Sequence, residues 1–110
     1  MSDPRDMVRS MPWPFEDWRF PAELGAVVMR TVLDGRRPAL LVWHSEGNDW
    51  AVGDGIRDPN ESGACVVTHI AHVVARDPTL AELAAMPPGT RADRPDRGSP
   101  WTITPAPDEA

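Results

Sequence analysis

Runs of apolar and β-branched residues in the middle of the chain predict the first strands of a small sheet. The segment 26–33 reads Ala-Val-Val-Met-Arg-Thr-Val-Leu and ends at an Asp-Gly turn dipeptide, 34–35, a combination typical of the first strand of a hairpin. The second strand is expected over 39–44, where apolar residues occupy both alternating sets of positions. A strand of this kind is covered on both faces, so we expect it in the middle of the sheet.

Shorter β-forming segments follow, separated by turn residues. The Glu-Gly-Asn sequence at 46–48 is a turn that leads into a third strand at 49–52, and the apolar segment 64–67 predicts a fourth. The segment 90–94 is a candidate edge strand. Because short turns join sequence neighbours, the pattern predicts a meander.

Two short helices are expected after the fourth strand. Thr68 is a suitable N-cap for a helix over 69–76, and the Asp77-Pro78 step ends that helix because a residue before proline is steered out of the α region. Pro78 can then open a second helix over 79–86. The residues predicted to face the sheet are Ile70, Val73, Val74, Leu80 and Leu83.

These elements define the fold class and the domain limits. We expect an α+β fold with a small, mainly antiparallel sheet of three to five strands and one or two helices packed on one face. The chain of 110 residues fits one domain. Because prolines punctuate both ends, we place a single α+β domain at 15–101, between a flexible N-terminal segment at 1–14 and a flexible C-terminal tail at 102–110.

An aromatic cluster lies near the N-terminus. Trp13, Phe15, Trp18 and Phe20 fall within eight residues and are interleaved with prolines and charged residues. One interpretation, which we favour, folds this segment over the second face of the sheet, where each buried ring would contribute about 2 to 3 kcal/mol. The other interpretation leaves some of the rings exposed as anchors for a partner, since Trp and Arg dominate binding energies at interfaces.

Charge and composition narrow the function classes. The formal net charge is -6, which argues against nucleic-acid binding because nucleic-acid-binding proteins concentrate positive charge. Every basic residue is Arg, so Asp–Arg pairs should be common. The single Cys65 forms no internal disulfide, and no apolar run approaches the length of a membrane span or a signal-peptide core. We therefore expect a cytoplasmic protein that binds neither nucleic acid nor membranes.

The order of several short motifs resembles known bacterial proteins. The motifs are Val-Trp-His at 42–44, Asp-Trp at 49–50, Gly-Asp-Gly at 53–55, DPTLAELAAMPPG at 77–89, the arginines Arg91 and Arg94, and a late Trp101. This layout resembles a group of small, mostly uncharacterised bacterial proteins and is similar to a broader family catalogued among the immunity proteins of bacterial polymorphic toxin systems. It departs from the closer group at Thr90 and Asp93, where that group carries aromatic residues. The resemblance implies a compact binding module and supplies no catalytic motif.

Four residues could serve an enzyme. His69 and His72, spaced i, i+3 on the predicted helix, could reach one metal ion with Cys65 or His44 as a third ligand, and Cys65 beside a histidine could act as a nucleophile. The pattern favours structural roles, because His72 falls on the solvent side of the predicted helix and Cys65 lies in the apolar strand sequence Ala-Cys-Val-Val. We expect no metal or other cofactor, and a small metal-dependent or Cys/His hydrolase is kept as an alternative.

These observations favour a non-enzymatic protein-interaction module, with an immunity-like inhibitor as one form of it. Its partner would be another protein, bound through an acidic and aromatic surface on the second and third strands and the N-terminal segment, since acidic inhibitors associate rapidly with basic targets. The residues expected to form that surface are Trp18, Trp43, Asp49, Trp50 and Asp54. A structural or regulatory homodimer is the other alternative, because a strand that is apolar on both faces can pack against a second copy.

Overall fold

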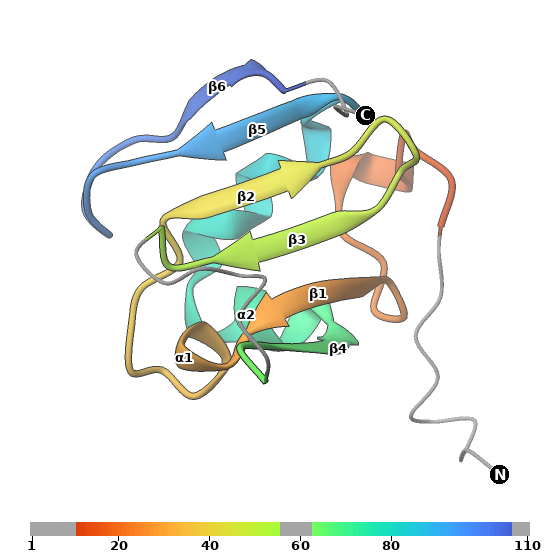
Figure 1. Ribbon diagram of the computed structural model, residues 1–110. Helices are drawn as coiled ribbons and strands as arrows, with labels where there is room; N and C mark the ends of the chain where they lie inside the picture. The colour runs from red at the N-terminus through yellow and green to blue at the C-terminus, as the bar shows by residue number, and fades with distance from the viewer. Residues whose placement is uncertain (1–10, 56–62, 107–110) are drawn as a thin grey trace, which may run out of the picture.

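Six strands pair into one sheet with the order β4-β1-β3-β2-β5-β6 (Figure 1). The computed structural model describes residues 11–55 and 63–106. Within that part of the chain the strands are β1 Gly25–Met29, β2 Leu41–His44, β3 Trp50–Gly53, β4 Cys65–His69, β5 Thr90–Asp93 and β6 Thr102–Pro105. Among these strands β1 and β3 run parallel, and the other neighbours are antiparallel. The α+β class and the mainly antiparallel sheet are confirmed, although the sheet is larger than the three to five strands expected.

The predicted hairpin between the first two strands is wrong, because β3 lies between β1 and β2. After β1 the chain enters the short helix α1, Arg30–Leu33, where the sequence suggested more strand residues. Thr31 and Val32 are buried in this helical turn, and the Thr31 hydroxyl donates a hydrogen bond of 2.8 Å to the buried carboxylate of Asp54. This tertiary contact overrides the β propensity of Thr and Val. The meander is wrong as well, since β1 pairs with β3 and β4.

The strand predicted at 39–44 lies in the interior of the sheet, as expected. It forms β2, between β3 and β5, and its residues Val42 and His44 are buried. The candidate edge strand at 90–94 forms β5, but it is not at the edge, because β6 pairs with it along its whole length. Strand β6 belongs to the segment 102–110 that the sequence predicts to be a flexible tail.

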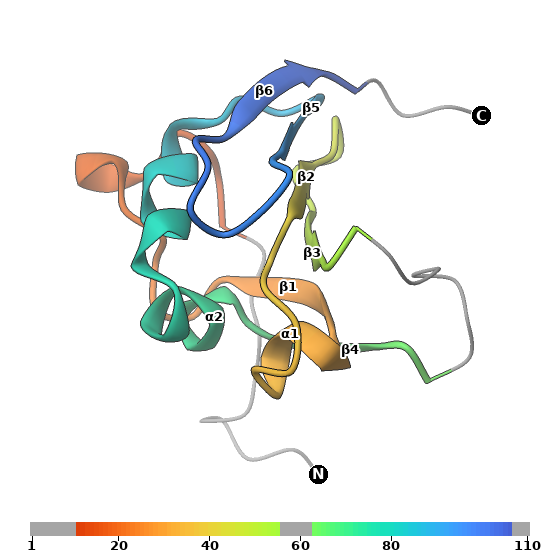
Figure 2. The same ribbon diagram turned by 90° about the vertical axis from the view of Figure 1, so that its left-hand side faces the viewer.

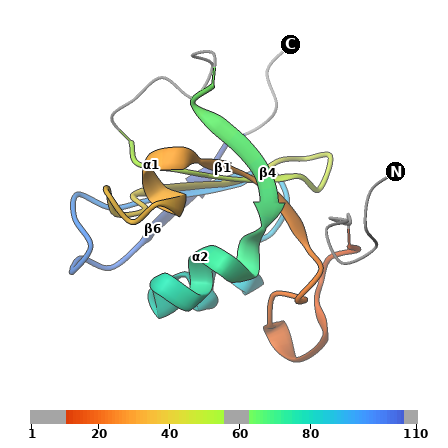
Figure 3. The same cartoon turned by 90° about the horizontal axis from the view of Figure 1, so that it is seen from below.

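The helix α2, Ile70–Arg76, and the 3-10 helix η3, Pro78–Ala85, cover one face of the sheet (Figures 2 and 3). Burying an aliphatic side chain of their size contributes about 1.5 to 3 kcal/mol. The side chains predicted to face the sheet and found buried are Ile70, Val73, Leu80 and Leu83. In the described residues no helix is long and apolar enough to cross a membrane.

The caps of these two helices differ from each other. Asp77 separates the helices, and its carboxylate caps η3 by accepting a hydrogen bond from the amide of Thr79. The predicted N-cap Thr68 does not cap α2, because His69 takes that position and no side chain there makes a capping bond. Instead, the Ile70 amide donates a hydrogen bond of 3.0 Å to the carbonyl of Leu24, which ties the start of α2 to the start of β1.

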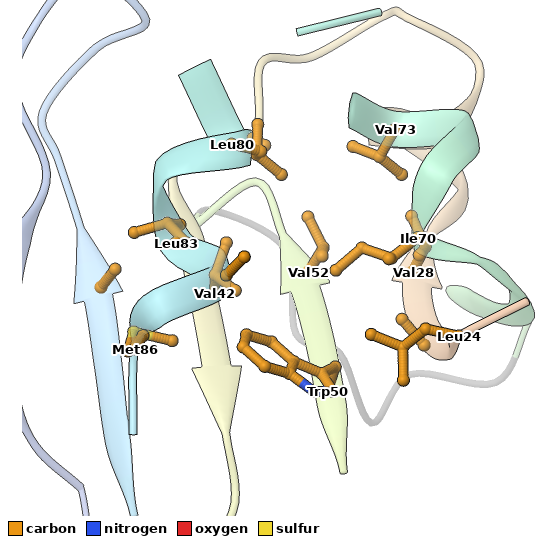
Figure 4. Packing of buried hydrophobic residues seen from close by; sticks show 14 of the residues in the cluster. Leu24, Val28, Val42, Trp50, Val52, Ile70, Val73, Leu80, Leu83 and Met86 are labelled. Atoms are coloured by element: carbon orange, nitrogen blue, oxygen red, sulfur yellow. The ribbon is translucent and has the colours of Figure 1, made fainter. Parts of the chain in front are cut away.

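The N-terminal aromatic segment packs on the face that the helices cover, so the prediction that it covers the second face is wrong. The ring centroids of Phe15 and Phe20 lie 6.0 and 5.0 Å from that of Trp50. Trp50 and His44 are register partners, and Trp50 joins Val42 and the helical side chains in the core (Figure 4). The aromatic segment therefore completes the helical layer over the Trp50 end of the sheet.

Candidate functional site

One end of the sheet is acidic. Strand β2 ends there at His44, β3 begins at Trp50, and the N-terminal aromatic segment packs against both. We call the segments 11–24 and 45–50 the acidic end. Arg19 is the one basic residue in these segments. Their acidic residues are Glu16, Asp17, Glu23, Glu46 and Asp49.

A buried histidine ties the segments of the acidic end together. The Nδ1 atom of His44 lies 2.7 Å from the carbonyl oxygen of Met86, and Nε2 lies 2.6 Å from Oδ1 of Asn48. The Asn48 side-chain amide donates a hydrogen bond of 2.7 Å to the carbonyl of Met11. The imidazole also stacks on Trp50, with ring centroids 3.8 Å apart. His44 thus links η3, the β2–β3 turn and the N-terminal segment, a role that networks of buried hydrogen bonds often have.

Trp18 is exposed but firmly placed. It ends the 3-10 helix η2, Glu16–Trp18, and its side chain is 54% exposed. Asp17 and Trp18 have φ of 57° and 54°, and each non-glycine residue in this left-handed region costs about 1 to 2 kcal/mol. The Trp18 amide donates a hydrogen bond of 3.2 Å to the carbonyl of Phe15. The ring centroids of Trp18 and Trp13 lie 5.9 Å apart. Packing of the neighbouring rings therefore offsets the backbone strain that turns Trp18 outward.

Trp18 borders an apolar groove between η2 and the helices α2 and η3. The groove has a volume of about 520 Å³, and Asp17 and Arg19 supply its charged rim. We call it the Trp18 groove. Its apolar lining consists of Trp18, Phe20, Ala71, Val74, Ala75 and Ala81. The small alanine side chains leave this space open between the two helices and the aromatic segment.

The structure separates the five residues expected to form the interaction surface. Trp18 and Asp49 are exposed at the acidic end, whereas Trp50 is buried directly beneath it. Trp43 is half-buried and points to the second face of the sheet, because it alternates with the buried Val42. Asp54 is fully buried against Thr31. Trp50 and Asp54 are therefore interior residues and do not belong to the exposed surface. Within the described residues the indole Nε1 of Trp50 has no hydrogen-bond partner.

The residues of the hydrolase alternative do not come together. Cys65 and His69 stand at opposite ends of β4, about 13 Å apart at the rise of an extended strand. The rings of His69 and His72 are neighbours, with centroids 5.6 Å apart, whereas both ring nitrogens of His44 already face oxygen atoms. Among residues 11–55 and 63–106, no group of three or more His, Cys, Asp or Glu side chains could hold a metal ion.

Cys65 has the chemistry of a structural thiol. Its pKa is raised above the ordinary value of 9.0, mainly because burial disfavours the thiolate; the nearby Asp54 adds to the rise and Arg30 opposes it. A thiol with a raised pKa is almost entirely protonated at neutral pH, and the protonated form is a poor nucleophile.

The sequence reasoning missed the groove and the role of His44. Ala71 and Ala75 are spaced i, i+4 on α2, a pattern that marks one face of a helix, but nothing local shows that Trp18 lies opposite them. The bonds of His44 to Met86 and Asn48 join residues up to 42 positions apart, so only the folded chain reveals them.

Comparison with known proteins finds no matching family profile, no similar curated sequence and no similar solved structure.

Proposed function

We propose that this protein is a non-enzymatic protein-interaction module that binds a basic partner protein through the Trp18 groove and the surrounding acidic end. The observation that carries the proposal is the placement of Trp18. A large aromatic ring is held half-exposed by a strained backbone, beside an open apolar groove. Strained non-glycine residues cluster at functional sites, because folding alone gives no reason to retain them.

The groove and the ring together resemble the centre of a binding interface. Tryptophan is enriched among residues whose truncation costs 2 kcal/mol or more in binding, and such residues sit beside well-packed pockets. An apolar side chain of the partner, inserted between Trp18 and Ala75, would remove apolar surface of both proteins from water. Because Trp18 is already fixed by Trp13 and Phe15, little conformational entropy is lost when the partner binds.

The charge of the acidic end selects the partner. Five carboxylates and one arginine occupy segments 11–24 and 45–50, so a partner with Lys or Arg around its apolar contact is attracted, and an acidic partner is repelled. Such steering raises association rates and weakens with salt. A basic toxin domain is a partner of this kind, and we name it because the order of the short motifs in the sequence is similar to that of immunity proteins.

The experiment compares three forms of the immobilised full-length protein: native, Trp18→Ala and Ile103→Ala. Each is exposed to extract of the source organism at low and at high salt, and bound proteins are quantified by mass spectrometry. We expect a basic protein that binds the native chain in stoichiometric amount, is at least about ten-fold depleted on Trp18→Ala and is released by salt.

The Ile103→Ala variant is the matched control, because Ile103 is 49% exposed but lies on β6, outside the groove. It should retain the partner fully. The proposal is rejected if every protein that binds the native chain binds Trp18→Ala equally, or if Ile103→Ala loses the partner to the same degree. Circular dichroism of both variants distinguishes loss of the groove from loss of the fold.

A second candidate function, a homodimer, is favoured by the other face of the sheet. We call the face away from α2 and η3 the open face. Val27 and Val67 are cross-strand partners on it and are 41% and 59% exposed. Arg91 and Asp93 alternate with the buried Ala92 on β5 and so present opposite charges on the same face. A two-fold axis could pair these charges between two copies while the valines pack together, which is why a second copy suits this face.

A further inference from the structure

Four arginines line one concavity at the end of the sheet opposite the acidic end. At this end of the sheet β2 begins and β5 ends (Figure 1). They come from the loop after α1, from the end of α2 and from the segment after β5: Arg36, Arg37, Arg76 and Arg97. The concavity has a volume of about 560 Å³ and an apolar floor that includes Val32, Val73 and Ala39. We call it the arginine pocket. Its size is that of a small-molecule site.

The positive charge of the arginine pocket is only partly compensated. Among its described lining residues the one carboxylate is Asp77, which already lies 2.7 Å from Nη2 of Arg94 and 3.6 Å from Nε of Arg97. Arg36 pairs with the exposed carboxylate of Asp34, which lies 3.1 Å from Nη2 of Arg36. Within residues 11–55 and 63–106 the guanidinium groups of Arg37 and Arg76 have neither a hydrogen bond nor an ion pair. Like charges gathered in one concavity repel one another, and a bound anion would reverse that repulsion.

Buried groups hold the arginine-bearing loop at both ends. The backbone amides of Arg36 and Arg37 both donate to the carbonyl of Thr31, at 2.9 and 3.0 Å, and the Thr31 side chain is fixed by Asp54. At the other end the carbonyl of Ala39 accepts two hydrogen bonds from Arg94, at 3.1 and 2.9 Å. The loop is therefore fixed before any ligand binds, which lowers the entropic cost of binding.

Gly35 lies close to the guanidinium of Arg76. Gly35 has a φ of +78°, and a Cβ atom at this position would lie 2.8 Å from Nη1 of Arg76. A larger residue at this position would require the flexible end of the Arg76 side chain to shift and would also be strained at this positive φ. Arg97 in turn donates a hydrogen bond of 2.9 Å to the carbonyl of Arg76. These contacts bring the ends of three separate segments to one side of the pocket.

We propose that the arginine pocket binds a small phosphorylated molecule through its phosphate or pyrophosphate group. Guanidinium groups present planar forks of N–H donors that match phosphate oxygens in pairs. Four of them suit a group that carries two or more negative charges, and the apolar floor at Val32 and Val73 suits the organic part of the ligand. The net charge of -6 belongs to the whole chain, whereas folding gathers these arginines locally.

The test titrates the full-length protein with inorganic pyrophosphate, with adenosine diphosphate and with citrate, using isothermal calorimetry at moderate salt. We expect saturable one-site binding of pyrophosphate and of the nucleoside diphosphate, with citrate weaker. Arg76→Gln and Arg37→Gln should each weaken binding about ten-fold or more, because each removes a hydrogen bond between charged groups.

Arg30→Gln is the matched control, since Arg30 is an exposed arginine on α1 outside the pocket, and it should bind like the native protein. Equal weakening by Arg30→Gln would show attraction to net charge alone and would overturn the proposal. No saturable binding of either phosphate compound up to about 10 mM overturns it as well. Binding of a short DNA duplex without binding of pyrophosphate would assign the arginines to nucleic acid instead and would also reject it.

Discussion

Arg94 joins several segments through a set of buried polar contacts. Its side chain is 1% exposed, and all five of its N–H donors are used. The acceptors are the carbonyl of Ala39, the carboxylate of Asp77, the hydroxyl of Thr79 and the carbonyl of Arg97. The Cζ atom of the guanidinium lies over the ring of Trp101, 4.0 Å from the ring centroid. Removing one partner of such a buried pair costs about 3 to 5 kcal/mol, because the other charge stays buried and unpaired.

Asp77 should make stability depend on pH. Burial alone would raise its pKa, but hydrogen bonds from Thr79 and Arg94 and the charge of Arg94 outweigh burial and lower the pKa below 3.8. A lowered carboxyl pKa contributes stability that is present above the unfolded-state value and is lost as the pH falls through the folded-state value. We therefore expect the free energy of unfolding, measured with urea, to fall as the pH drops below about 4.

Asp77→Asn should lose about 3 to 5 kcal/mol at pH 7 and should then show a flatter decline on acidification. Asp34→Asn is the control, because Asp34 is exposed and forms a surface ion pair with Arg36, and surface pairs contribute about 1 kcal/mol or less. Parallel pH profiles for the native protein and Asp77→Asn would contradict this assignment.

At the scale of elements, the β2–β3 turn fastens the N-terminal segment to the sheet. Asn48 has a φ of 69°, and its side chain bridges His44 and the carbonyl of Met11. The turn thus does two things: it reverses the chain between two central strands, and it holds the segment that carries Trp18. Asparagine suits both, because it tolerates the left-handed region and offers a donor and an acceptor.

Substitutions at Asn48 should separate these two tasks. Asn48→Gly keeps the turn but loses both hydrogen bonds, so we expect a loss of about 2 kcal/mol. Asn48→Ala loses the same bonds, and the strained left-handed backbone lowers its free energy of unfolding by about 1 kcal/mol more. Thermal and urea unfolding of the two variants measure the difference. Equal stability of the glycine and alanine variants would mean that the turn conformation is not strained.

At the scale of the whole molecule, the sheet is covered unequally. The face under α2, η3 and the aromatic segment holds the core (Figures 2 and 4), whereas Val27 and Val67 stay exposed on the open face. Contiguous exposed apolar groups on a sheet commonly mark a contact with another protein. One face of the central strand therefore packs against the core inside the molecule, and the other face is the surface on which we proposed that a second copy binds.

Light scattering of the concentrated protein should report a mass of twice 12.1 kDa. Val67→Lys places a charge on the open face beside Val27, on the edge strand β4. We expect it to yield the monomer, because burying an unpaired charge is costly. Ile103→Lys changes another exposed apolar residue, on β6, and should remain dimeric. The homodimer proposal would be rejected if the native protein were monomeric, or if Val67→Lys remained a dimer.

The site was only partly predictable. Trp18 and Asp49 were expected at a surface and are exposed there, because a proline-rich aromatic segment and an acidic turn are recognisable locally. Trp50 and Asp54 were expected beside them and are buried, because their exposure depends on which segments pack over β3 and α1. The arginine pocket could not be anticipated, since Arg36 and Arg97 are neighbours only in the folded chain.

The sequence by itself determined where several of the secondary-structure elements lie, although it did not predict the helix α1 or the strand β6. The strand at 39–44, the helix ending at Asp77-Pro78 and the buried positions Val73 and Leu83 follow from periodicity and turn residues, which act over a few neighbours. The tertiary structure alone decided which strands pair, which face the aromatic segment covers, and where charges gather. Insertion of β3 between β1 and β2 rests on hydrogen bonds and packing between segments far apart in the chain, and such contacts leave no local signal in the residues that make them.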